Sequence, residues 1–160
     1  MTGKRASLQR GFTLVEMLVV VAIVGILAAA AHPVLELSLQ RSREIELRQS
    51  LRTLREAIDA YKRAVDDKRV AAAPDASGYP PSLQALVEGV PDLRAQDRRL
   101  YFLRRLPRDP FADPALPAQR TWGLRSYDSA PEAPAPGRDV FDVYSTSERN
   151  GLDGTPLREW

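Results

Sequence analysis

The apolar run at residues 12–31 constrains this chain more than any other stretch, because Glu16 is the only ionisable side chain within it. As an α-helix, about 20 residues rising about 1.5 Å each span roughly 30 Å, the thickness of the hydrocarbon core of a bilayer. The residues before the run carry three basic side chains, Lys4, Arg5 and Arg10, and no acid. The sequence therefore predicts an N-terminal membrane helix that carries a domain outside the membrane.

A cleavable secretory signal peptide is the first alternative, because the alanines at residues 28–31 resemble the small residues that precede a cleavage site. The apolar run is longer than the roughly 7–15 residues of a signal peptide, and Glu16 lies in its first turn. An unpaired carboxylate at the bilayer centre costs about 2.5–3.5 kcal/mol, so such residues usually have a partner. Length and Glu16 together favour a retained membrane segment.

The sequence Gly-Phe-Thr-Leu-Val-Glu at residues 11–16 resembles the processing site of type IV pilins and type II secretion pseudopilins. The resemblance implies that a prepilin peptidase cleaves after Gly11 and methylates the new amino group of Phe12. It also implies that Glu16 is the assembly residue, which neutralises the amine of Phe12 of a neighbouring subunit inside the filament. Buried charges are tolerated when they are paired in this way. Pro33 ends the apolar run, either as a break at the membrane exit or as the helix-kinking proline that family members often carry.

An amphipathic pattern continues the helix from Glu36 to about Lys68. Its apolar side chains recur at spacings of four and three residues, which is typical of one helix face. This stripe consists of Leu47, Leu51, Leu54, Ile58, Tyr61 and Val65. We expect it to cover a small sheet, although a coiled coil with another subunit would use the same pattern. The turn-rich sequence that follows predicts a helix end near residues 70–74.

The rest of the chain predicts short elements. A second helix is expected from Pro81 or Ser82 to about Glu88, and residues 98–105 form either a buried strand or a short turn. Residues 121–127 and 140–145 are predicted as strands, joined by a mobile Pro/Ala/Gly-rich linker at residues 129–138. A third strand could come from the C-terminal residues or from residues 100–103. In the later strand, alternation places Val140, Asp142 and Tyr144 on one face and Phe141 and Val143 on the other.

The predicted class is therefore α+β and pilin-like, with a long N-terminal helix packed on a small antiparallel C-terminal sheet. We expect three parts: a leader peptide at residues 1–11, a transmembrane and polymerisation segment at 12–33, and a periplasmic globular domain at 34–160. The last part includes the amphipathic half of the long helix.

The segment at residues 145–160 is rich in oxygen ligands and glycines. Calcium takes six to eight oxygen ligands on a turning backbone, and Ser145, Glu148, Asn150 and Asp153 could supply them. The resemblance to major pseudopilins implies a calcium site here, because those proteins carry one in the corresponding loop. This loop is shorter than theirs and lacks their run of successive acidic residues. The alternative is two ordinary turns at the Asn-Gly and Asp-Gly pairs.

Composition argues against catalysis and nucleic-acid binding. The chain has no cysteine and one histidine, His32, which lies beside the apolar run, so thiol chemistry and His-based triads are not expected. No glycine-rich phosphate loop occurs. The net charge is +2, but without the leader 20 basic residues stand against 21 acidic ones. No run of basic residues interleaved with aromatics points to a nucleic acid.

The resemblance to major pseudopilins of type II secretion extends to Tyr79-Pro80, to Pro-Arg-Asp-Pro-Phe at residues 107–111 and to residues 142–145. It implies a structural subunit that polymerises with itself from the bacterial inner membrane to drive export of folded proteins. The implied partners are prepilin peptidase, minor pseudopilins, the inner-membrane assembly platform and the lipid bilayer. Alternatives are a minor pseudopilin, a type IV pilin of an adhesion, motility or DNA-uptake filament, and a signal-anchored periplasmic binding domain that does not polymerise.

Overall fold

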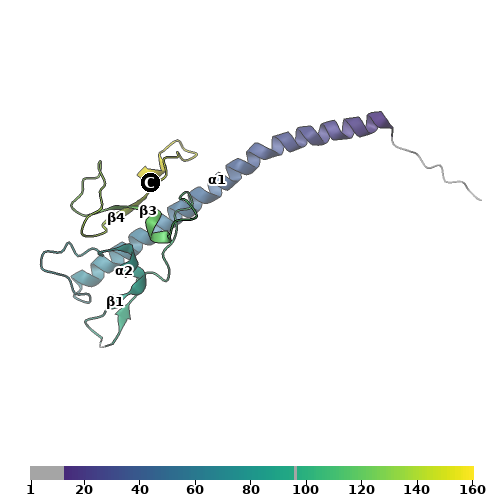
Figure 1. Cartoon of the computed structure of the whole chain (residues 1–160). Coiled ribbons are helices and arrows are strands. Elements are labelled where there is room, and N and C mark those ends of the chain that lie inside the picture. Colours follow the sequence, from purple (N-terminus) through teal and green to yellow (C-terminus); the bar gives the residue numbers. More distant parts are fainter. Residues whose placement is uncertain (1–12, 96) are drawn as a thin grey trace, which may run out of the picture. The chain divides into compact units, whose positions relative to one another are not determined.

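The computed structural model describes residues 13–95 and 97–160, without the side chains of residues 30–33. The chain divides into two compact units, Met1–Leu39 and Gln40–Trp160. The long helix α1, Leu14–Asp66, contributes to both. Strands occur only as short antiparallel pairs among the described residues (Figure 1), which confirms the predicted α+β class. The predicted leader lies outside the described residues, so its boundary stays a prediction.

In the first unit, α1 begins at Leu14, where the hydroxyl of Thr13 accepts a 3.2 Å hydrogen bond from the main-chain N–H of Glu16. A threonine in this place satisfies one of the free N–H groups of a helix start. The large apolar side chains that follow are exposed within the unit, from 44% at Met17 to 81% at Leu14. The helix continues past Pro33 without a break in its assignment.

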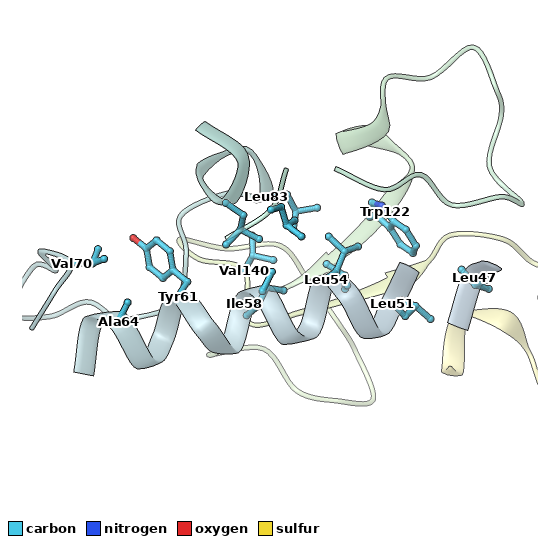
Figure 2. Close-up of a cluster of buried hydrophobic side chains, with 14 of the residues drawn as sticks. Leu47, Leu51, Leu54, Ile58, Tyr61, Ala64, Val70, Leu83, Trp122 and Val140 are labelled. Atoms are coloured by element: carbon cyan, nitrogen blue, oxygen red, sulfur yellow. The ribbon is translucent and has the colours of Figure 1, made fainter. Parts of the chain in front are cut away.

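In the second unit, the predicted stripe of α1 forms the core (Figure 2). Its residues are at most 6% exposed, apart from Val65, which is half-buried. Leu83, Trp122 and Val140 from later segments belong to the same cluster. The interpretation of the stripe as a core-facing surface is thereby confirmed.

Helix α1 ends at Asp66, a few residues earlier than predicted. Lys68 adopts a left-handed conformation with φ of 56°, which is the usual way for a helix to reverse its chain at the C-terminus. The main-chain N–H groups of Arg69 and Val70 then both donate to the carbonyl of Ala64. Val70 is buried by this reversal rather than lying in an open loop.

The second helix is as predicted: α2 spans Leu83–Glu88, and the side chain of Ser82 accepts a hydrogen bond from the main chain of Ala85. Gly89 ends it with φ of 74°. Strand β1, Val90–Pro91, then pairs with β2, Arg99–Leu100. Residues 100–103, which the sequence left open as the source of a third strand, do not add one to the C-terminal pair: only Leu100 of these residues lies in a strand, and its partner is β1.

The C-terminal pair consists of β3, Trp122–Arg125, and β4, Asp142–Ser145. Both are shorter than the predicted strands. The predicted grouping of Val140 with Asp142 and Tyr144 is wrong: Val140 and Val143 are both in the core, at 2% and 0% exposure. The reason is that regular alternation begins only at Asp142, while the N–H of Val140 donates to the carbonyl of Pro80 outside the sheet.

Short 3-10 helices at Ala118–Arg120 (η1) and Leu157–Glu159 (η2) complete the fold. The register of the C-terminal pair places Gly123 opposite Tyr144. A Cβ atom at Gly123 would lie 2.3 Å from the ring of Tyr144, so the ring lies directly over the glycine.

Candidate functional site

The candidate assembly residue Glu16 lies in the first turn of α1, with an exposed side chain. Gly11 and Phe12 lie outside the described residues, so the processing site and the assembly role of Glu16 stay predictions. Among residues 13–95 and 97–160, no basic side chain forms an ion pair with the Glu16 carboxylate. The described part of the chain therefore leaves this charge available for a group from elsewhere.

The part of α1 that contains Glu16 is strongly apolar. An 18-residue window of α1 has a mean hydropathy of 2.7, and none of it is buried within the chain. Length and composition suit a helix that crosses a membrane. Large exposed apolar surfaces of this kind require a cover, either lipid or other protein.

The four predicted calcium ligands belong to the segment 145–160, which we call the terminal loop. Ser145 is fully buried, and its hydroxyl donates a 2.5 Å hydrogen bond to a carboxylate oxygen of Asp109. Asp153 binds Arg48 through Oδ2 at 3.1 Å and accepts the main-chain N–H of Thr155 at Oδ1. Both side chains thus already have protein partners.

The other two candidates give no further support to a metal site. Glu148 is exposed, and Asn150 forms an isolated bridge with Pro156. Within the described residues, no group of three or more acidic, histidine or cysteine side chains is placed to hold a metal. The arrangement does not fit the calcium site that the resemblance implies, and calcium binding stays a prediction from the sequence.

Sequence reasoning missed the side chains of α1 that hold the terminal loop. Glu44 is only 7% exposed, and its Oε1 atom accepts the main-chain N–H of Leu152 at 2.8 Å. The guanidinium of Arg48 lies 4.1 Å from the ring centroid of Trp160. Arg55 donates to Asp142 and to the main-chain oxygen of Trp160, both at 2.8 Å. The sequence did contain one indication of this role, because these charged residues lie next to the apolar stripe of the helix.

The electrostatics of the loop favour an ionised Asp153. The hydrogen bond from Thr155, together with the charge of Arg48, lowers the pKa of Asp153 below its ordinary value. A second acid behaves alike where α1 ends: the side chain of Asp92 is 5% exposed and lies 2.6 Å from Arg69. The hydrogen bond from Arg69, with a further one from the main chain of Arg94, lowers the pKa of Asp92.

Comparison with known proteins identifies a family model and several relatives. Residues 6–31 match the family described as the prokaryotic N-terminal methylation motif. The chain is 32% identical to type II secretion system core protein G of Escherichia coli (strain K12) over 110 residues, which are 66% of this chain and 68% of that protein. The chain belongs to this core protein G family.

Other members give the same result. The protein of that name from Klebsiella pneumoniae is 35% identical over 109 residues, covering 64% of this chain and 69% of its own length. The one from Pectobacterium carotovorum subsp. carotovorum is 32% identical over 114 residues, covering 68% and 66%. No solved structure is significantly similar to the chain. The resemblance to major pseudopilins is confirmed, and the minor pseudopilin and type IV pilin alternatives are not favoured.

Proposed function

We propose that the chain is a structural subunit of the pseudopilus of a type II secretion system and that its copies polymerise through the apolar part of α1. Membership in the core protein G family supports this function. The observation that carries the mechanism is the exposed Glu16 within an otherwise apolar helix.

The assembly step follows from the cost of an unpaired charge. In a filament, the helices of neighbouring subunits cover one another's apolar surface, and Glu16 loses its water. An isolated carboxylate in an apolar environment is strongly unfavourable, whereas one paired with a cation is tolerated. Cleavage after Gly11 supplies that cation as the amine of Phe12, and methylation leaves its positive charge in place. Glu16 of one subunit then pairs with Phe12 of its neighbour.

The location follows from the same segment. Before assembly, the apolar helix crosses the bacterial inner membrane once, with the basic leader on the cytoplasmic side according to the positive-inside rule. The second unit, Gln40–Trp160, then lies in the periplasm. The proposed partners are prepilin peptidase, the inner-membrane assembly platform, minor pseudopilins and further copies of this chain.

The test compares Glu16→Ala and Glu16→Gln with the wild type in cells that contain prepilin peptidase and the secretion machinery. Glu56→Ala is the matched control, because Glu56 is an exposed glutamate of the same helix in the second unit. We expect both Glu16 variants to lose filaments and exported substrate, and Glu56→Ala to keep both. Normal filaments from Glu16→Ala would refute the pairing.

Mass spectrometry of the membrane fraction tests the processing step separately. We expect the mature chain to begin at Phe12 and to carry one methyl group on its amine. A mature chain that begins elsewhere would refute the assignment of Gly11 and Phe12.

A further inference from the structure

We propose that charged side chains of α1 fasten the terminal loop in place of a calcium ion, so that the fold of this chain does not depend on calcium. Arg48 supplies the positive charge and Glu44 anchors the backbone of the loop. The proposal rests on the contacts of these two residues and not on the pseudopilus function.

A calcium ion at the terminal loop would need negative charge from its ligands. Calcium sites gain most of their affinity from carboxylates. At the turn of the loop, Asp153 is the acidic side chain, and both of its oxygens are used by the protein: Oδ2 by Arg48 at 3.1 Å and Oδ1 by the N–H of Thr155 at 3.0 Å. The guanidinium of Arg48 therefore already neutralises this carboxylate, as a bound cation would.

The group of α1 that holds the backbone of the loop is negatively charged. The loop turns the N–H of Leu152 toward the buried carboxylate of Glu44, at 2.8 Å, and Gln40 donates to the same oxygen at 3.0 Å. Calcium binds oxygen atoms and repels N–H groups. A loop whose backbone N–H points at a carboxylate is thus held by an anion, which a calcium ion cannot replace.

Backbone carbonyls supply part of the coordination in calcium loops. The carbonyl of Thr155 accepts the N–H of Gly151 at 2.9 Å, and the carbonyl of Arg149 accepts the N–H of Leu157 at 3.0 Å. The carbonyl of Gly151 accepts the N–H of Gly154 at 2.9 Å. These three carbonyls of the loop thus already accept main-chain donors.

Trp160, the aromatic residue of the loop, is held by two arginines of α1. The guanidinium of Arg48 stacks on Trp160 at 4.1 Å, and a Cβ atom at Gly151 would lie 2.5 Å from the same ring. Trp160 thus contacts both Arg48 and the turn, while Arg55 holds its main-chain oxygen at 2.8 Å. Leu157, fully buried, fixes the segment between them. One guanidinium therefore binds both the acid and the aromatic ring of the loop.

The test uses the full chain in detergent micelles and measures the melting temperature by circular dichroism, once with excess calcium chloride and once with a calcium chelator. We expect the two melting temperatures of the wild type to agree within about 1 °C, because only a ligand that binds the folded state shifts the transition. A melting temperature that falls with chelator and is restored by calcium would overturn the proposal.

A second measurement tests whether Arg48 performs the fastening. Hydrogen exchange of the peptide covering residues 150–160 is compared in Arg48→Met and in Arg52→Met, since Arg52 is exposed on the same helix. The side chains of Arg48 and Asp153 are 59% and 48% exposed, so their ion pair is a surface pair. Its loss, together with the loss of one cation–π contact, should make exchange about five- to tenfold faster in Arg48→Met. Arg52→Met should leave it unchanged. Equal exchange in the two variants would overturn the role of Arg48.

Glu44→Ala provides an independent check. It removes the buried acceptor of the Leu152 N–H and should speed exchange in the same peptide by more than Arg48→Met does, because an unsatisfied buried donor costs more than a lost surface pair. Exchange in Glu44→Ala that stays at the wild-type rate would overturn the role of Glu44.

Discussion

The substitution Leu54→Ala tests whether the stripe of α1 is a core surface within one chain. Leu54 is completely buried among the apolar side chains of the second unit (Figure 2). Alanine is the strongest helix former, so the backbone of α1 keeps its conformation and the change reports on packing alone.

The expected loss follows from the burial. The change removes three carbon atoms, worth about 0.8 kcal/mol each when fully buried, or about 2.4 kcal/mol. The cavity left behind adds to this, and Leu→Ala changes in cores cost about 2.7–5.0 kcal/mol. We expect a loss near 3 kcal/mol. With an unfolding entropy of about 2.1 cal/mol/K per residue over roughly 120 residues, the melting temperature falls by about 12 °C.

The assay is thermal unfolding of the full chain in detergent, followed by near-ultraviolet circular dichroism, which reports on the packing of Trp122 and its neighbours. Ile45→Ala is the control, because Ile45 lies on the same helix and is 60% exposed. Its substitution should change the stability by no more than about 0.5 kcal/mol. If both variants shifted the melting temperature equally, or if the loss in Leu54→Ala depended on protein concentration, the stripe would be an interface between chains and our assignment would be wrong.

Two further predictions concern other parts of the second unit. Gly123→Ala should lower the free energy of unfolding by about 1–3 kcal/mol, because its Cβ would overlap the ring of Tyr144; the double variant with Tyr144→Ala should recover part of the loss, and a fully additive double variant would contradict the overlap. The pKa of Asp92 is lowered in the folded state, so the ionised side chain contributes to the free energy of unfolding. This contribution is fully present above pH about 4, where the unfolded group ionises, and it is lost as the pH falls through the lower pKa of the folded state. Melting temperatures at pH 6 and pH 3 should therefore differ less in Asp92→Asn than in the wild type, and an unchanged pH dependence would contradict the role of the pair with Arg69.

Local patterns in the sequence were sufficient to predict the helices. The stripe of α1 has a strict helical period, and α2 begins at Ser82 and ends at Gly89, both of which have well-known positional preferences at helix ends. The short pair β1–β2 left no such signal. Each strand has only two residues, which are too few to show alternation. One residue of β1 is Pro91, and proline argues against a strand in the sequence.

The contacts of the terminal loop could not be predicted for a different reason. Arg48 and Asp153 are 105 residues apart in sequence, and their pairing depends on where the C-terminal strands place the loop relative to the helix. The sequence identified Asp153 as a charged ligand but could not identify its partner. The processing motif is the opposite case, because all of its residues lie within one short segment.

The arrangement of the core along α1 has a mechanical consequence. The stripe from Leu47 to Val65 covers roughly 27 Å of the helix at about 1.5 Å per residue, and it lies parallel to the axis. A tensile load applied along α1 therefore acts on this surface in shear. Sliding the helix would break the contacts along the stripe together, whereas peeling would break them one after another. Force directed along the helix thus loads the contacts of the buried side chains at the same time.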